Sequence, residues 1–151
     1  MQAKVNQIID EIGVLSSNSQ GLPSVITTSL KFFGSDNRVY LKVEGNKVIG
    51  LLRVGRKKLF IRDEAGGVKE IEPICVLDFY VYQSCQRSGF GKQLFEFMLE
   101  DQRTEPHYLA YDKPTEKFLS FLSKHYGLKT FVPQVNNFVI FTNYFWNDPT
   151  Y

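Results

Sequence analysis

The sequence predicts a single α/β domain with a mixed central β-sheet flanked by helices. Two observations carry this prediction: apolar residues recur at helical spacing in some segments and at strand spacing in others, and the two kinds of segment alternate along the chain. The chain has 151 residues, of which 43% are hydrophobic. This length suits one core, so residues 1–151 are expected to form one domain.

Apolar faces at helical spacing predict three helices. The first covers residues 4–15, and a turn-rich linker follows at Ser16–Pro23. The second begins after a glycine-bearing turn near residue 90, and the third follows Pro114 and ends at a capping Gly127. The three apolar faces consist of Val5, Ile8, Ile9 and Ile12; of Leu94, Phe95, Met98 and Leu99; and of Phe118, Leu119, Phe121 and Leu122.

Strand patterns fill most of the remaining chain. Residues 39–43 alternate and are joined to the apolar run 48–54 by a Gly-Asn turn, which predicts a β-hairpin. Residues 59–61 continue in extended form up to a turn at 63–67. The segment Ile74–Tyr82 is rich in β-branched and aromatic residues and predicts a buried central strand. Short strands are expected at 108–111 and 135–142.

Composition argues against several classes of protein. The formal net charge is +2, so bulk charge gives no reason to expect binding to nucleic acid. No apolar run approaches the roughly 20 residues of a membrane span, and the first residues, MQAKVNQIIDEIG, do not read as a signal peptide. Cys75 and Cys85 lack neighbours at zinc-ligand spacing, so no metal site is expected. We therefore expect a soluble, intracellular domain whose cysteines are reduced.

The stretch QRSGFGKQ, residues 86–93, follows the predicted central strand and opens a helix. Such a strand, glycine turn and helix can bind phosphate, because the helix N-terminus presents unpaired N–H groups and a partial positive charge. A Walker A loop would need glycine at Gln86 and a hydroxyl at Gln93. A dinucleotide fingerprint would need a third glycine at Leu94. A plain strand-to-helix loop stays open as the simplest reading of these residues.

The same stretch resembles the pyrophosphate loop of GNAT acetyltransferases, whose pattern is Gln/Arg-x-x-Gly-x-Gly/Ala. Gln86-Arg87-Ser88-Gly89-Phe90-Gly91 matches every fixed position. The longer segments EPICVLDFYVYQSCQRSGFGKQLFEFMLE, EPHYLAYDKPTEKFLSFLSKHYGL and VPQVNNFVIF are similar to the catalytic domain of α-tubulin N-acetyltransferases. This resemblance implies a GNAT-like fold and acetyl transfer from acetyl-CoA to a lysine of α-tubulin in microtubules. It also implies a monomer that is located in the cytoplasm, on the microtubule cytoskeleton.

The resemblance also implies roles for particular residues. Cys75 and Asp112 match the catalytic cysteine and aspartate, and Asp78, Asn136 and Asn137 lie on the substrate side. The implied acetyl-CoA contacts are Phe79, Tyr80, Val81, Tyr82, Gln83, Ser84, Cys85, Gln86, Arg87, Ser88, Gly89, Phe90, Gly91 and Lys92, followed by Thr115, Glu116, Lys117, Phe118, Leu119, Ser120, Phe121, Leu122, Ser123 and Lys124. The family carries a glutamine in the stretch matching residues 30–37, where an ungapped reading places Phe33.

Acetyl transfer needs a deprotonated amine, a polarised thioester carbonyl and a well-placed cofactor. Cys75 and Asp112 are expected to share the deprotonation, with direct attack by the amine in a ternary complex. Backbone N–H groups of the segment 78–82 are expected to polarise the carbonyl. By local pattern alone, Cys75 would be a core residue and Asp112 would cap the helix after Pro114.

The sequence leaves two questions open: the role of a group of basic residues, and the function itself. The basic residues Arg53, Arg56, Lys57, Lys58 and Arg62 form either a solvated sheet edge or a patch that steers the protein toward acidic microtubules. The alternatives to a tubulin acetyltransferase are a GNAT enzyme with another acceptor and a protein that binds acetyl-CoA and microtubules with weak or lost catalysis.

Overall fold

Strand β5, Ile74–Val81, is buried over most of its length. The computed structural model describes residues 2–20, 36–83, 86 and 88–146. They fall into two compact units that share this strand. Unit 1 takes in Met1–Gly55 and Leu77–Gln102, and unit 2 takes in Arg56–Val76 and Arg103–Tyr151.

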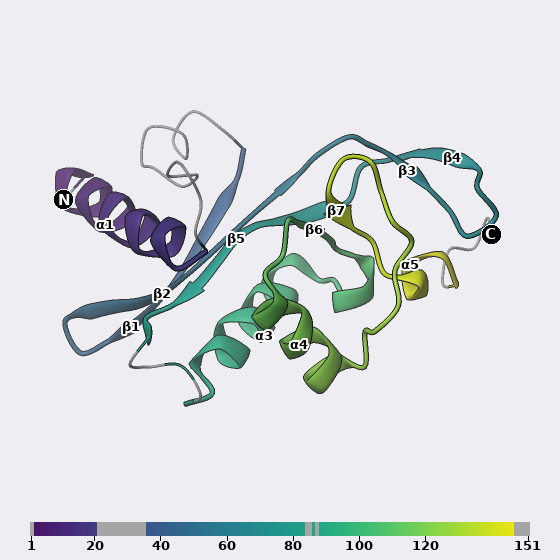
Figure 1. Ribbon diagram of the computed structural model, residues 1–151. Coiled ribbons are helices and arrows are strands. Elements are labelled where there is room, and N and C mark those ends of the chain that lie inside the picture. The colour runs from purple at the N-terminus through teal and green to yellow at the C-terminus, as the bar shows by residue number, and fades with distance from the viewer. Residues whose placement is uncertain (1, 21–35, 84–85, 87, 147–151) are drawn as a thin grey trace. The chain divides into compact units, whose positions relative to one another are not determined.

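The main sheet has five strands in the order β1-β2-β5-β6-β7, and β3 and β4 form a separate two-stranded sheet. Strand β5 pairs in parallel with β6, whereas β1 with β2 and β6 with β7 are antiparallel, so the main sheet is mixed. The strands are β1 Arg38–Glu44, β2 Lys47–Arg56, β3 Leu59–Arg62, β4 Val68–Ile71, β6 Ala110–Asp112 and β7 Phe138–Val139 (Figure 1). The helices are α1 Gln2–Gln20, α3 Phe90–Gln102, η2 Pro106–Tyr108, α4 Glu116–Tyr126 and α5 Thr142–Trp146.

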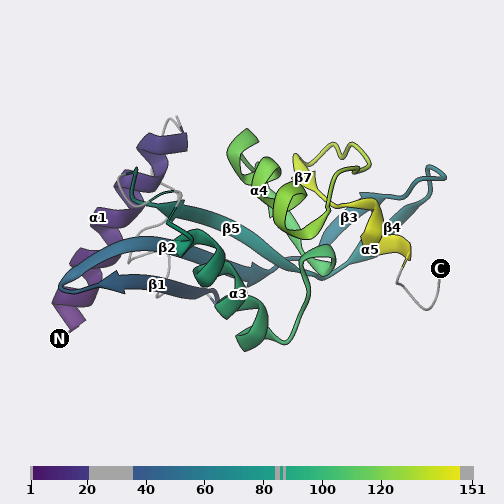
Figure 2. The same cartoon turned by 90° about the horizontal axis from the view of Figure 1, so that it is seen from below.

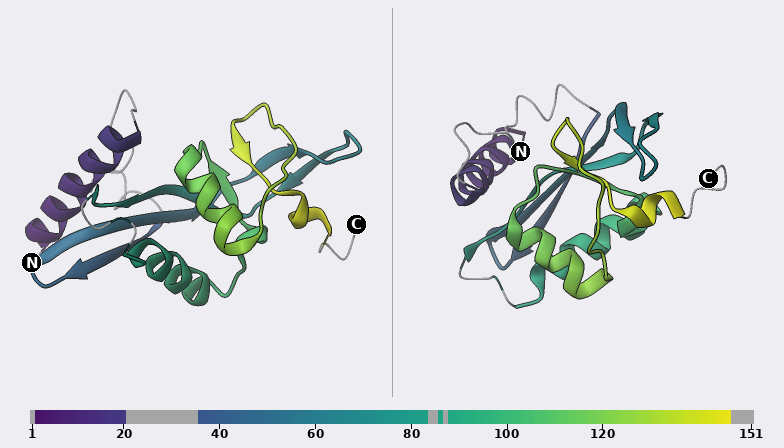
Figure 3. Two further views of the ribbon diagram at one scale, coloured as in Figure 1. Left: turned by 60° about the horizontal axis from the view of Figure 1, so that its bottom comes forward. Right: turned by 45° about the vertical axis from the view of Figure 1, so that its right-hand side comes forward.

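In unit 1, helices α1 and α3 cover opposite faces of the strands (Figure 2). The α1 side of the sheet holds a core cluster of Ile12, Leu51 and Tyr80. On the α3 side, Phe79 of β5 stacks on Phe95 with ring centroids 6.0 Å apart. Phe79 and Tyr80 are successive residues of β5, so their side chains point to opposite faces of the strand, as its pleat requires. The ribbon in Figure 3 shows α1 and α3 on opposite sides of the strands of unit 1.

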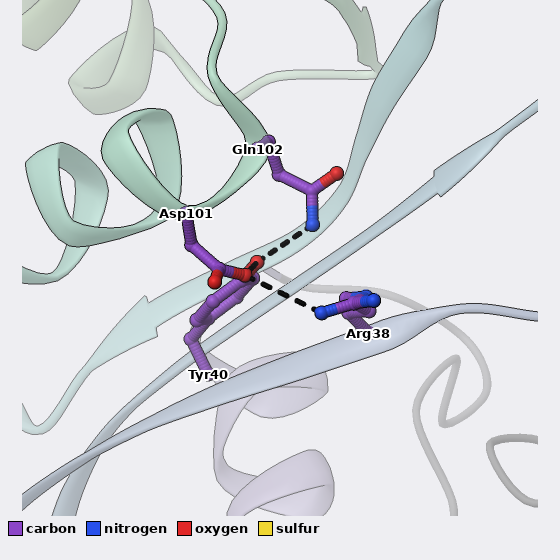
Figure 4. A network of polar contacts seen from close by, with 4 residues as sticks. All are labelled: Arg38, Tyr40, Asp101 and Gln102. Atoms are coloured by element: carbon purple, nitrogen blue, oxygen red, sulfur yellow. Dashed lines mark hydrogen bonds and ion pairs between the residues drawn. The ribbon is translucent and has the colours of Figure 1, made fainter.

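A polar network ties the last turn of α3 to strand β1 (Figure 4). The Tyr40 hydroxyl donates a hydrogen bond to the Asp101 carboxylate and accepts one from Gln102 Nε2 at 2.7 Å. Arg38 Nη1 lies 3.5 Å from Asp101 Oδ2. Burial raises the pKa of the Tyr40 phenol, and its bond to Asp101 raises the pKa further. The Tyr40 ring packs edge-on against Phe97 at 6.0 Å, so both ends of this side chain hold α3 in place.

In unit 2, Tyr111 of β6 forms the centre of an aromatic cluster. Its fully buried ring meets Phe118 of α4 and Phe141 in edge-on contacts at 5.4 and 5.6 Å. Its hydroxyl donates to the Pro106 carbonyl at 2.6 Å, which satisfies the one polar atom that the ring carries into the core. Strand β6 is therefore held from both sides.

Most predicted elements are confirmed. The hairpin forms, with Gly45 in its turn at φ 61°, and β5 is buried as predicted. Helix α3 buries Leu94, Phe95 and Met98. Helix α4 ends at Gly127, whose left-handed φ of 68° is the conformation that glycine tolerates best.

The first helix is longer than predicted, and part of the predicted linker is helical. Helix α1 runs on to Gln20 because Ser16 and Gln20, one turn apart, both donate hydrogen bonds to the buried Asp78 carboxylate. A tertiary partner has overridden the turn preference of serine. The rest of the predicted linker, residues 21–23, lies outside the described residues.

The short strands near the C-terminus also differ from the prediction. Tyr108 belongs to η2, and β6 starts at Ala110. The predicted strand 135–142 shrinks to β7, because Asn137 turns the chain with a positive φ of 66° and Thr142 already begins α5. Strand β4 was not predicted and follows the turn at 63–67.

The network of Figure 4 predicts the effect of a single hydroxyl. Tyr40→Phe keeps the ring but leaves the Asp101 carboxylate without its best donor, so the free energy of unfolding should fall by about 1–2 kcal/mol in urea titrations. Arg38→Gln, which removes only an exposed ion pair, should cost less than about 0.5 kcal/mol. If the two variants lost the same free energy of unfolding, the Tyr40 hydroxyl would contribute no more to stability than the exposed ion pair.

Candidate active site

The glycine turn in unit 1 has the geometry of an anion cradle. Gly89 has a left-handed φ of 86°, and its carbonyl accepts the first hydrogen bond of α3, from Gln93 N at 3.0 Å. The first N–H groups of α3 have no partner within the helix, and α3 is the next α-helix after β5. This is the place where a helix N-terminus attracts phosphate.

The side chain of Gln86 is hydrogen-bonded to the end of β5. Its Nε2 donates to the carbonyl of Val81, the last residue of β5, at 2.8 Å. Gly91 lies over the same strand end: a Cβ added there would sit 3.5 Å from Val81 Cγ2 and 3.6 Å from Phe79. The start of α3 therefore lies against the end of β5.

The other residues predicted to contact the cofactor in this unit have mixed surroundings. The Tyr80 side chain is buried in the core cluster beside α1, so the residue can offer only its backbone. The N–H of Tyr82 donates to the Ile49 carbonyl at 2.6 Å, so it is engaged in the sheet and does not polarise a thioester. Lys92 Nζ lies 3.6 Å from the Glu96 carboxylate on the next turn. Three predicted contacts, Ser84, Cys85 and Arg87, lie outside the described residues.

Helix α4 in unit 2 carries the second group of predicted cofactor contacts. Its N-cap is Thr115, whose hydroxyl accepts a hydrogen bond from Phe118 N at 3.2 Å. The alternative reading in which Asp112 caps this helix is therefore wrong. Lys117 and Lys124 are exposed, whereas Leu122 is buried.

Cys75 and Asp112 lie on neighbouring strands of unit 2. Cys75 pairs in parallel with Ala110, and Asp112, two residues further along β6, shares the face of Ala110. The Cys75 thiol is fully buried, with Sγ 3.5 Å from the Pro73 carbonyl. Asp112 is half-buried at the end of its strand.

Burial keeps the Cys75 thiol in its neutral form. It raises the pKa to about 12; the charge of Lys57 and its backbone N–H pull the other way, and the Asp112 carboxylate adds a smaller rise. A thiol with so high a pKa holds its proton at neutral pH. The thiol is therefore not in the ionised state that could accept a proton.

The predicted substrate residues Asn136 and Asn137 form a turn beside Asp112. Asn136 Oδ1 accepts a hydrogen bond from Phe138 N at 3.0 Å, and Phe138 pairs with Asp112 across β6 and β7. The Asn137 carbonyl accepts one from Lys113 N at 3.3 Å. Unit 2 therefore brings together both predicted catalytic residues and both asparagines.

Asp78, the third predicted substrate residue, is 3% exposed and bound by helix α1. Ser16 Oγ and Gln20 Nε2 both donate to its Oδ1, the latter at 2.9 Å. Sequence reasoning missed these partners, although their spacing of four residues was the available signal. Phe33 lies outside the described residues, but Gln20 shows that this chain does place a glutamine beside a predicted substrate residue.

The five residues of the predicted basic patch have different surroundings. Arg53 is half-buried in unit 1, where its Nη1 donates to Asn37 Oδ1 at 3.0 Å. In unit 2, Arg56 Nη1 donates to the Glu72 carbonyl at 3.1 Å. The remaining three basic residues are exposed in unit 2; they are Lys57, Lys58 and Arg62.

Two further sequence expectations concern what the described residues contain. Over these ranges, no group of three or more histidine, cysteine, aspartate or glutamate side chains is placed to hold a metal ion. Within the same part of the chain, no helix combines the length and apolar character needed to cross a membrane.

Comparison with known proteins agrees with this geometry. The family model for "GNAT acetyltransferase, Mec-17" matches residues 1–150. An α-tubulin N-acetyltransferase of Tetrahymena thermophila is 49% identical over 147 residues, which are 97% of this chain and 37% of that protein. α-Tubulin N-acetyltransferase 1 of Danio rerio is 47% identical over 148 residues, covering 94% and 50%. The chain thus spans half or less of the length of these two relatives.

A solved acetyltransferase of Trypanosoma brucei shares the fold, with a TM-score of 0.55 and 18% identity over 86% of this chain and 92% of that one. The fold class and the family resemblance predicted from the sequence are both confirmed. With the family model matching residues 1–150, the chain belongs to the Mec-17 family of GNAT acetyltransferases.

Proposed function

We propose that this protein transfers the acetyl group of acetyl-CoA to a lysine side chain of α-tubulin in microtubules. The observation that carries the proposal is the glycine turn, where Gly89 in a left-handed conformation precedes the first residue of α3 in the connection from the buried strand β5. Membership of a GNAT family gives this cradle its ligand. The relatives named α-tubulin N-acetyltransferase give the acceptor.

Acetyl-CoA, when bound, supplies the acetyl thioester. The first N–H groups of α3 would hold its pyrophosphate, with Lys92 adding positive charge at the same end of the helix. Gln86, which lies between β5 and α3, is hydrogen-bonded to the last carbonyl of β5. The contacts implied for residues 115–124 remain part of the proposal and rest on the family resemblance.

The acceptor lysine must lose a proton, because a free lysine amine has a pKa of about 10.4. Asp112 is the group of unit 2 that is placed to take it, at a strand end and half-buried. A carboxylate that bound substrate shields from water holds a proton more tightly, which suits a general base. Cys75 lies on the adjacent strand as a neutral thiol, paired with Ala110, two residues before Asp112.

The state of Cys75 also favours direct attack by the amine. A cysteine acts as a nucleophile through its thiolate, and the buried thiol here has its pKa raised to about 12. Direct transfer in a ternary complex needs no such thiolate. The Asn136–Asn137 turn beside Asp112 would then border the path of the acceptor.

One assay tests the proposed function as a whole. The protein is incubated with acetyl-CoA and assembled microtubules, and acetyl-lysine is mapped by mass spectrometry. Acetylation of α-tubulin supports the proposal. Acetylation of other proteins alone would indicate a different acceptor, and binding of acetyl-CoA without any transfer would indicate a binding protein.

The two glycines of the turn should respond differently to alanine. Gly89→Ala forces a side chain into the left-handed region and should weaken acetyl-CoA binding by at least about tenfold. Gly91→Ala adds a Cβ at ordinary contact distance from Val81 and should bind within about threefold of wild type. Isothermal titration calorimetry measures both, and equal affinities would contradict the cradle.

Removal of the proposed base should slow the reaction without affecting the cofactor. Asp112→Asn keeps the size of the side chain but cannot accept the proton, so kcat should fall by about 10²- to 10⁴-fold. The affinity for acetyl-CoA should stay within about twofold. A wild-type kcat in this variant would rule out Asp112 as the base.

The neutral thiol of Cys75 can be checked by alkylation. With a pKa of about 12, only about one thiol in ten thousand is ionised at pH 8, against about a quarter for an ordinary cysteine. Iodoacetamide should therefore modify Cys75 at least about a thousandfold more slowly in the native protein than in urea. Peptide mass spectrometry distinguishes Cys75 from Cys85. Fast modification of native Cys75 would reveal an activated thiolate.

A further inference from the structure

The side chain of Gln134 is hydrogen-bonded to the backbone of Arg62, the last residue of β3, in unit 2. Its Oε1 accepts a hydrogen bond from the Arg62 N–H at 2.7 Å, and its Nε2 donates to the Arg62 carbonyl at 2.8 Å. The same Nε2 also lies 3.3 Å from the Val132 carbonyl. One carboxamide thus satisfies both backbone groups of Arg62, 72 residues away in the chain, as a neighbouring strand would.

This contact belongs to a series of hydrogen-bonded contacts that links β3 with the strands of the two predicted catalytic residues. Just before β3, Lys57 N donates to the Pro73 carbonyl, two residues before Cys75. Cys75 pairs with β6, and Asp112 at the end of β6 pairs with Phe138 of β7. The chain before β7 runs back through the Asn136–Asn137 turn to Gln134. Gln134 is the link that joins this segment to β3.

Apart from the hydrogen bond that Asn136 Oδ1 accepts from Phe138 N, two features show how the segment after Gln134 is placed. Val135 is 91% exposed, so it adds no burial. Asn137 adopts a positive φ of 66°, a conformation that costs a non-glycine residue free energy and persists only when neighbouring contacts fix it. The Gln134 carboxamide supplies two such contacts from outside the turn.

We propose that Gln134 is a positioning residue for the acceptor side of the active site, which anchors the segment 134–137 to β3 and so holds the Asn136–Asn137 turn beside Asp112. This inference rests on the proposed acetyltransferase function. The hydrogen-bond partners of the Gln134 side chain are Arg62 and Val132, both of unit 2, so its loss should affect the use of the acceptor and leave acetyl-CoA binding unchanged.

Steady-state kinetics with acetyl-CoA and assembled microtubules test the proposal. In Gln134→Ala, kcat/KM for microtubules should fall by about ten- to a hundredfold, while the dissociation constant of acetyl-CoA stays within about twofold. Gln134→Glu keeps the size and the acceptor for the Arg62 N–H, but it lacks the donor for the Arg62 carbonyl. It should show a loss of the same kind, because the anchor needs both bonds.

A matched control and a local probe separate positioning from general stability. Gln102→Ala removes a glutamine that donates one hydrogen bond in unit 1, and it should leave kcat/KM for microtubules at the wild-type level. Hydrogen exchange of the Arg62 amide should become faster in Gln134→Ala, which removes its acceptor, and stay unchanged in Gln102→Ala.

The failures of the two proposals can be told apart. If the wild-type protein acetylates no acceptor, the proposed function is wrong and the role of Gln134 falls with it. If the wild type is active and Gln134→Ala keeps its kcat/KM for microtubules, the proposed function stands and the role of Gln134 is overturned. Equal losses in acceptor use and acetyl-CoA affinity would also overturn it.

Discussion

The burial of β5 is the constraint on which the rest of the candidate site depends. Each of its residues from Ile74 to Leu77 is less than 9% exposed, so the strand is fixed in position. Chemically useful groups can then be placed by their order along it. Cys75 lies near its start, Asp78 lies in its middle, and the glycine turn follows its end. Any slip of one residue would turn all of these side chains to the opposite face.

The two units treat their buried polar groups in different ways. In unit 1 the Asp78 carboxylate is buried with two side-chain donors from α1, which compensates the cost of taking it out of water. In unit 2 the Cys75 thiol has only a weak contact with a carbonyl and stays neutral. Asp112, at a strand end, keeps access to solvent. The Asp78 carboxylate is therefore engaged in structural hydrogen bonds, whereas the Asp112 carboxylate can contact a substrate.

The sequence predicted those features that depend on local chemistry. The left-handed glycines of the α3 turn and the α4 cap follow from the absence of a Cβ, and the apolar run of β5 announces a buried strand. Features that depend on distant partners could not be predicted in this way. The helical state of Ser16 to Gln20 depends on Asp78, some 60 residues away.

The candidate site shows the same division. The pairing of Cys75 with β6 follows from the order of the strands, but the protonation state of the thiol depends on burial that no local pattern reveals. The predicted strand 135–142 failed because alternation cannot detect a positive φ at Asn137. The asparagine pair reads as part of a strand in sequence, whereas in the structure it forms the turn beside Asp112.

The hydrogen bond from Gln86 to the Val81 carbonyl explains a tolerance within the GNAT loop pattern. That pattern admits glutamine or arginine at its first position, two side chains that differ in charge and shape. What they share is length and a terminal N–H group. If the task of this position is to donate one hydrogen bond to the last carbonyl of the preceding strand, then either residue can perform it. The alternation in the pattern then reflects a shared donor and says little about charge at the cofactor.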